Sequence, residues 1–161
     1  MGNLLFSPSG RINAPSYFKG MMIIAVIGAL ASLLALVNPA VGIIGTLVSL
    51  VLFYCFFALT IKRTHDAGRS GWMSIVWLIL LIVVSLVIGA VVGIFTGVSF
   101  MDIMSASMAQ DTELVAELSQ KTIIPSAIGS IIVYAISAFL INMLNKSDPH
   151  DNQFGPVTPS A

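Results

Sequence analysis

The residues best suited to chemistry lie in one short stretch, residues 62–72, which reads KRTHDAGRSGW and separates two long apolar runs. Its adjacent His65 and Asp66 resemble part of a metal-dependent hydrolase site, but such a site needs further His and Asp ligands. The only other histidine is His150, and the single cysteine, Cys55, adds no metal-ligand spacing. We therefore expect no catalytic residue, metal site, cofactor or enzyme activity.

The elements that must position this stretch are membrane helices. The chain is 57% hydrophobic and 9% charged, whereas soluble domains carry about 25% charged residues. A bilayer-spanning helix needs about 20 apolar residues. We predict an all-α integral membrane protein, a single domain with a four-helix bundle, whose helices cover roughly residues 19–37, 41–62, 72–98 and 122–145. Because the formal net charge is zero, no nucleic-acid partner is expected.

Charge placement sets the predicted orientation. One side of a four-span chain holds both termini and the central charged stretch, and the other side has Lys121 as its single cation. The cations on the first side are Arg11, Lys19, Lys62, Arg63, Arg69 and Lys146. The positive-inside rule therefore predicts an inner (plasma) membrane protein with both termini in the cytoplasm.

The predicted spans hold no ionisable residue well inside them, which disfavours an ion-coupled transporter. Gly89, Gly93 and Gly97 recur every four residues and leave one helix face without side chains. We favour close packing inside the bundle as the explanation for this stripe. The alternative is a homo-oligomer seam, and four helices alone enclose little lumen, so an oligomeric channel or carrier component would need such a seam.

Residues 100–121 have a different pattern, with apolar residues on one helical face and polar ones on the others. This pattern predicts an amphipathic segment on the outer membrane surface, with Asp111 or Thr112 capping a second short helix. Its methionines (Met101, Met104 and Met108) could suggest a copper(I) site, but apolar packing is favoured because no His or Cys supports one. The C-terminal residues 146–161 are expected to be a flexible tail.

Three motifs are similar to those of a known family. They are FSPSGRI at residues 6–12, the stretch at 62–72, and DNQFGP at 151–156. Together they resemble the small bacterial inner-membrane family catalogued as domain of unknown function 805 (DUF805). The resemblance covers nearly the whole chain and implies two helical hairpins around the central stretch, with no assigned activity. The segment at 100–121 is longer than the connector that the family pattern implies.

Topology and resemblance both place the three motifs on the cytoplasmic side. We expect one polar cluster there, formed by Arg11, Arg63, His65, Asp66, Arg69 and Asn152. In it, Asp66 would pair with one of the three arginines and Asn152 would bond loop backbone. Because guanidinium groups match phosphate oxygens in paired hydrogen bonds, the cluster is either a structural cap or a site for an anionic lipid headgroup.

We therefore expect a structural, partner-binding or anionic-lipid-interacting role. The channel or carrier component is the alternative. A membrane-embedded enzyme acting on phosphate-containing lipid is the least favoured interpretation.

Overall fold

Helix follows helix in this computed structural model, which describes residues 2–36 and 39–158. In chain order the elements are α1 (Gly2–Phe6), α2 (Ala14–Leu33), the short 3-10 helix η1 (Leu34–Leu36), α3 (Pro39–Asp66), the 3-10 helix η2 (Gly71–Met73), α4 (Ser74–Thr96), α5 (Phe100–Met108) and α6 (Thr112–Leu144). Four of these segments are long and apolar enough to cross a membrane: α2 with η1, α3, η2 with α4, and α6. The expected all-helical chain with four candidate spans is confirmed.

The first two spans have different ends from the predicted ones. The first helix begins at Ala14, five residues before residue 19, because the Asn13 side chain accepts a hydrogen bond from the Ser16 amide at 2.9 Å and Pro15 suits the first turn. The predicted end at residue 37 lies outside the described residues. The next helix continues to Asp66, four residues past residue 62, so the first half of the charged stretch is helical.

The predicted amphipathic segment forms α5 and the beginning of α6. A capping box starts α5, since Ser99 and Asp102 bond each other's backbone amides at 3.2 and 2.7 Å. Asp111 caps α6 by accepting from the Leu114 amide at 3.0 Å. The prediction of a second short helix is wrong, because no turn separates this segment from the fourth span. Instead α6 runs through Pro125, which membrane helices tolerate.

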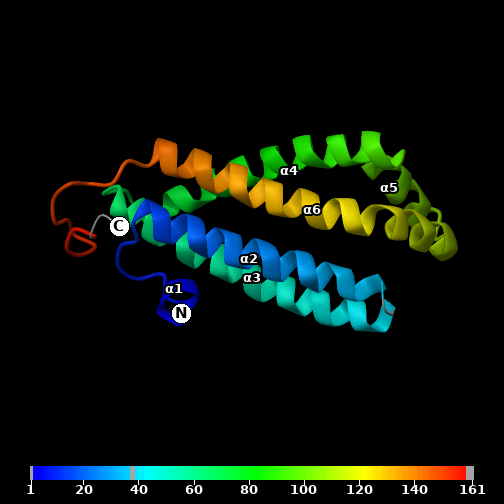
Figure 1. Cartoon of the computed structure of the whole chain (residues 1–161), viewed down its shortest axis with the longest axis horizontal. Helices are drawn as coiled ribbons and strands as arrows, with labels where there is room; N and C mark the ends of the chain where they lie inside the picture. The colour runs from blue at the N-terminus through cyan, green and yellow to red at the C-terminus, as the bar shows by residue number, and fades with distance from the viewer. Residues whose placement is uncertain (1, 37–38, 159–161) are drawn as a thin grey trace.

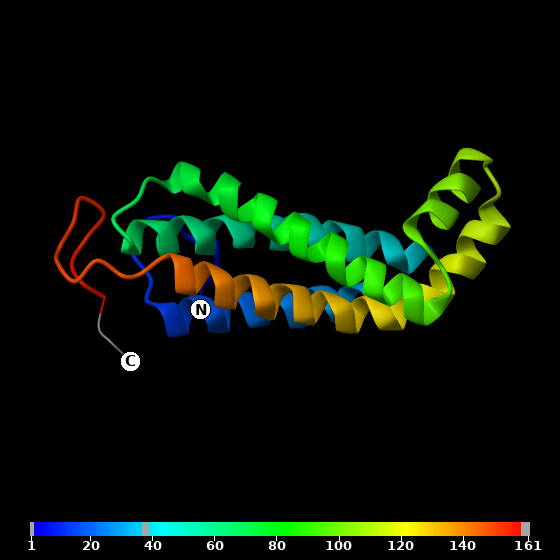
Figure 2. The same cartoon turned by 90° about the horizontal axis from the view of Figure 1, so that it is seen from above.

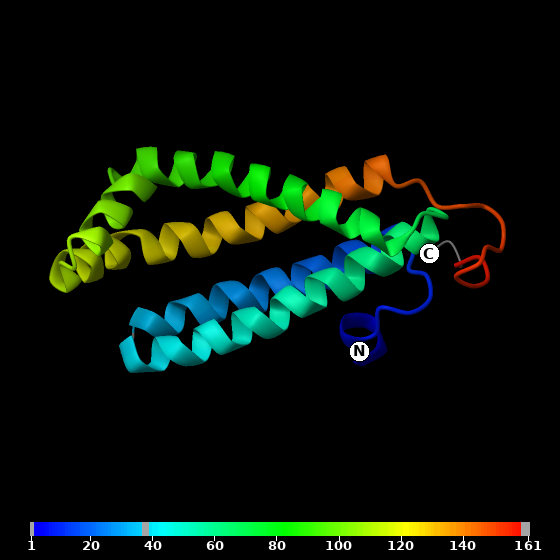
Figure 3. The same cartoon turned by 180° about the vertical axis from the view of Figure 1, so that it is seen from behind.

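Two antiparallel hairpins make up the bundle, α2 with α3 and α4 with α6 (Figure 1). Helix α2 also packs along α6, whereas α3 and α4 have little contact. Helix α1 and the residues that follow α6 lie at one end of the bundle, which we call the cap end, and α5 lies at the opposite end (Figure 1). The hairpins lie close together at the cap end and diverge toward the other (Figure 3). There α5 and the first turns of α6 bend away from the bundle (Figure 2).

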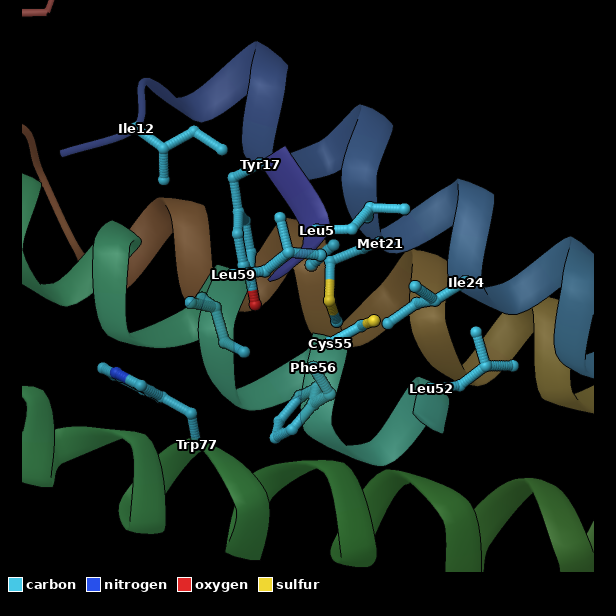
Figure 4. Close-up of a cluster of buried hydrophobic side chains, with 12 residues drawn as sticks. Leu5, Ile12, Tyr17, Met21, Ile24, Leu52, Cys55, Phe56, Leu59 and Trp77 are labelled. Atoms are coloured by element: carbon cyan, nitrogen blue, oxygen red, sulfur yellow. The ribbon is translucent and has the colours of Figure 1, made fainter. Parts of the chain in front are cut away.

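The packed core lies near the cap end. Tyr17 and Met21 of α2 meet Phe56 and Leu59 of α3, and Trp77 of α4 closes the cluster (Figure 4). The first four are fully buried and Trp77 is 5% exposed. Elsewhere the helices expose large apolar side chains, as surfaces that face lipid do. The core therefore joins both hairpins at the end where the charged residues gather.

Glycines mark where helix backbones approach closely. A Cβ on Gly45 would lie 2.6 Å from the carbonyl oxygen of Ala31, so the α2–α3 hairpin requires glycine there. A Cβ on Gly129 of α6 would lie 3.2 Å from Ile88 and 3.3 Å from Val92 of α4. Small residues at such contacts are the usual means by which membrane helices pack.

The glycine stripe on α4 has no such role. A Cβ on Gly89 or Gly97 would meet nothing within 4 Å, and one on Gly93 would meet only the turn at Val98 and Ser99. The expectation that the stripe packs inside the bundle is wrong for Gly89 and Gly97. The reason is that α4 turns a different face, with Ile88, toward α6.

Candidate functional site: a buried polar cap

Asp66, the last residue of α3, lies at the centre of the cap end with none of its side chain exposed. Its Oδ1 accepts from Arg11 Nε at 3.1 Å, and its Oδ2 accepts from Arg63 at 2.6 Å. The Thr158 hydroxyl donates a third bond at 2.8 Å. Two guanidinium groups and a hydroxyl thus satisfy a carboxylate that could not otherwise remain charged away from water. We call this group and its partners the polar cap: Arg11, Lys62, Arg63, His65, Asp66, Asn142, Asn145, Asp148, Asn152 and Thr158.

Arg11 ties the N-terminal segment to the C-terminal residues. Besides Asp66 Oδ1, its guanidinium donates to the carbonyl oxygens of Asp66, Asp148, His150 and Gly155 at 3.3, 2.8, 2.8 and 3.3 Å. These bonds use all five N–H groups of the side chain, which is 1% exposed. Arg11 therefore has no donor left for an outside ligand.

Arg63 is engaged in the same way, but toward α6. Its Nε donates to Asn142 at 2.7 Å, and its other nitrogens donate to Asp66, to the Ser147 hydroxyl at 3.0 Å and to the Asn145 carbonyl. The Asn142 amide continues the chain by donating to the Ala14 carbonyl at 3.1 Å. Arg63 thus joins α3, α6 and the start of α2, and only 2% of its side chain is exposed.

The residues after α6, for which a flexible tail is expected, lie against the cap as far as Thr158. The Asp148 amide donates to the Asp66 carbonyl at 2.7 Å, and the Asn152 side chain donates to the His65 carbonyl at 3.0 Å. Asn152 thus bonds backbone as expected. The pKa of Asp148 lies below its usual range because the His150 amide donates to its carboxylate at 3.1 Å, with smaller contributions from Asn152 and Arg11.

His65 is held between backbone and an aromatic ring. Its Nδ1 lies 3.2 Å from the carbonyl oxygen of Gly10, so this nitrogen carries a proton. Its ring stacks on Phe154 with centroids 3.8 Å apart and planes 4° apart. The stack links the central motif to the tail motif. His65 therefore fastens the tail rather than facing a pocket with other ionisable groups.

Arg69 is the exception among the predicted residues. It is exposed, it does not pair with Asp66, and the one hydrogen bond of its side chain to a described residue goes to Asn145 Oδ1 at 3.4 Å. Asn145 is fully buried, and its Nδ2 has no partner among the described residues. Five of the six predicted residues thus come together in the cap, and Arg69 lies at its edge with most of its donors unused.

Sequence reasoning missed Lys62 as a site residue. Lys62 is 4% exposed, and its Nζ donates to the carbonyl oxygens of Asn3 and Leu4 at 2.8 and 2.5 Å. A lysine one turn before the end of an apolar helix is usually assumed to extend into water. The segment that buries it, α1, lies 55 residues or more away in sequence, so no local pattern could signal the contact.

Within the part of the chain that the structure describes, no three His, Cys, Asp or Glu side chains are close enough to hold a metal ion. Both oxygens of the Asp66 carboxylate accept hydrogen bonds from the protein's own side chains, Arg11, Arg63 and Thr158. The arrangement can fix helix ends and termini, and along its edge it can offer positive charge.

Comparison with protein families gives one match. Residues 5–156 match the family described as protein of unknown function (DUF805), which includes all three motifs. Comparisons with curated proteins and with solved structures give no match.

Proposed function

The chain belongs to the DUF805 family, whose description assigns no activity, and we propose that it is a bacterial inner-membrane protein that binds anionic phospholipid at its cytoplasmic face. Four membrane-length apolar helices support a multi-pass protein. Six of the seven Lys and Arg residues belong to the cap end or its first helical turns. The positive-inside rule then favours a cytoplasmic cap.

The observation that carries the lipid proposal is the contrast between the arginines. The guanidinium groups of Arg11 and Arg63 donate to groups inside the protein. The side chain of Arg69 is exposed and makes one long hydrogen bond. A guanidinium with free donors at the membrane surface fits a phosphate group. The proposed headgroup site is therefore narrower than the predicted cluster and centres on Arg69.

The surroundings of Arg69 add donors. Ser70 precedes η2 without making a side-chain cap bond, so no side chain of Ser70 caps the first amides of η2, which follow Arg69 in the chain. A helix start carries partial positive charge and favours anions. The buried Asn145 amide next to Arg69 also has no partner within the described part of the chain, and a phosphate oxygen would satisfy it.

An apolar pocket of about 520 Å³ lies next to the start of η2, and Ser70 and Gly71 are among its lining residues. Phe57 and Ile61 of α3 line one side of it, and Trp72 and Ile75 of the α4 segment line the other. Trp72 is 79% exposed, as expected for an aromatic anchor at the headgroup layer. Positive charge above an apolar groove matches a phospholipid, with its phosphate at Arg69 and an acyl chain between α3 and α4.

We propose a structural role for the rest of the cap and no catalysis. The hydrogen bonds of Arg11, Arg63 and Asp66 to other groups of the protein support this. They close the helix ends and hold the segments before α2 and after α6. The stacked His65 supports it as well, because a general base needs access to a substrate proton.

Native mass spectrometry of the full chain in mild detergent tests the lipid site. We expect the wild-type protein to retain an anionic phospholipid such as phosphatidylglycerol. The Arg69→Gln variant should retain at least ten-fold less, because a hydrogen bond to a charged group contributes about 1.5–3 kcal/mol.

The matched control is Lys19→Gln, which removes one exposed positive charge near the cap end but lies away from the Asn145 amide and the pocket. It should retain lipid like the wild type. Equal lipid loss in both variants would mean that lipid retention depends on net charge and not on Arg69. Equal retention in Arg69→Gln and wild type would refute the site.

A further inference from the structure

Within residues 2–36 and 39–158, Lys62 is a buried cation without a carboxylate partner. The cap buries three cationic side chains, Arg11, Lys62 and Arg63, against one buried carboxylate, Asp66. Asp148 is 29% exposed, and it is its carbonyl, not its carboxylate, that bonds Arg11. Counting buried groups alone, the cap has an excess of two positive charges (3 − 1). An uncompensated buried charge is costly and calls for a counter-ion.

Helix dipoles do not change this balance, because α3 and α6 end at the cap whereas α2 and α4 begin there, and their opposite partial charges cancel. The partly exposed carboxylate of Asp148 interacts with Arg11 and offsets part of the excess. Arg11 and Arg63 are satisfied through Asp66 and through carbonyl groups, so the unbalanced charge resides on Lys62, whose two partners are neutral carbonyls.

A pocket of about 530 Å³ lies against Lys62 and Arg11. Hydroxyl groups line it, from Ser7, Ser9, Ser16 and Thr158. The beginning of the 20-residue α2 contributes Asn13 and Ser16 to the wall, and its dipole adds positive potential there. The pocket therefore combines a buried cation with the hydroxyls of three serines, since the Thr158 hydroxyl already donates to Asp66.

We propose that this pocket binds a phosphate group, and that the phosphate is the counter-ion of Lys62. A tetrahedral phosphate offers more acceptor oxygens than a carboxylate, which suits a wall of several hydroxyls around one ammonium. The volume leaves room for a substituent on the phosphate. The site is distinct from the one at Arg69, since the two pockets share no lining residue. The phosphate can belong to a phospholipid headgroup or to a soluble compound.

Two probes separate these sources: inorganic phosphate, followed by isothermal titration of the detergent-solubilised full chain, and phosphatidylglycerol, counted per protein by native mass spectrometry. A soluble source predicts saturable phosphate binding at low millimolar concentration or tighter. A lipid source predicts one retained phosphatidylglycerol that Arg69→Gln does not remove.

The decisive variant is Lys62→Met, which keeps an unbranched side chain one atom shorter and removes its charge. It should weaken binding of the relevant probe at least ten-fold, whereas Lys19→Met, an exposed lysine of α2, should leave it unchanged. Should Lys62→Met fail to fold, Ser9→Trp replaces it, because this exposed residue lines the pocket and a large ring would fill the space while Lys62 stays.

Phosphate or phosphatidylglycerol binding that Lys62→Met or Ser9→Trp abolishes supports the proposal. It is overturned if neither probe binds, or if binding persists in the folded variants. Loss of lipid in Arg69→Gln alone would support the headgroup site and leave none at Lys62, so the two proposals fail separately.

Discussion

At the scale of single residues, one carboxylate organises the cap. Asp66 holds two guanidinium groups whose remaining bonds reach α6, the start of α2 and the tail. Each of these groups is almost completely buried, so each depends on the other for its charge. Removing one member of such a set is far more costly than removing an exposed ion pair.

We expect Asp66→Asn to lower the free energy of unfolding by about 3–5 kcal/mol, because it leaves two buried guanidinium groups without a counter-charge. Reversible unfolding by SDS titration in mixed micelles measures this change. The control is Glu113→Gln, an exposed acid in the first turn of α6. A loss no larger than that of the control would contradict the central role of Asp66.

At the scale of elements, α4 differs from the other spans. It is the most apolar of the four and the least buried, with 11% of its span inside the protein against 33% for α2 and α6. Its open glycine stripe forms the floor of a groove of about 720 Å³, with exposed Ile94 and Phe100 at the sides. Hydrocarbon gives helices no hydrophobic drive to associate, so close backbone contact is the main source of attraction there.

We propose that a second copy of the chain packs on this face, and expect dimers in bilayers. Gly89→Leu should shift the protein to monomers without unfolding it, since Gly89 lies within α4 without a positive φ and a Cβ there meets nothing within 4 Å. Energy transfer between labelled copies in vesicles measures the dimer fraction.

The control for this experiment is Val87→Leu, an exposed position about half a helical turn from Gly89 on the opposite face of α4. It should dimerise like the wild type. A wild-type protein that stays monomeric at high protein density, or dimers that persist in the Gly89→Leu variant, would exclude this seam. Strict monomers would also disfavour the channel interpretation.

At the scale of the whole molecule, the bundle is fastened at one end. The buried core and the polar cap both lie at the cap end, where N-terminal segment, α3, α6 and tail are bonded together. Toward the other end the two hairpins diverge (Figure 3). The proposed lipid and phosphate sites both border the fastened end, so ligands there would bind a rigid part of the protein.

The proposed orientation predicts opposite labelling of the two ends. In intact spheroplasts, a membrane-impermeant maleimide should label Ser107→Cys in α5 and should label Ser9→Cys only after the membrane is opened. The unsubstituted chain is the control, because Cys55 is 1% exposed and should stay unlabelled. The reverse pattern would place the cap outside and refute the proposed cytoplasmic face.

The amino-acid sequence by itself determined the four candidate spans and the grouping of cations at one end. Both follow from local properties, because the cost of each residue in hydrocarbon depends on its type and its neighbours in sequence. The family resemblance rests on contiguous motifs in the same way. Where a helix continues past its apolar run, as α3 does to Asp66, hydropathy no longer indicates the end.

Only the tertiary structure decided which charged side chains are bonded inside the protein and which remain available to bind a ligand. Asp66 could have paired with any of three arginines. Its bond to Arg11 joins residues 55 apart in sequence, and the bond between Arg63 and Asn142 joins residues 79 apart; these long-range contacts settle the choice. The burial of Lys62 depends on α1, and the open face of the Gly89 stripe depends on how α4 is turned against α6. Such contacts join distant parts of the chain, and no periodicity or local composition specifies them.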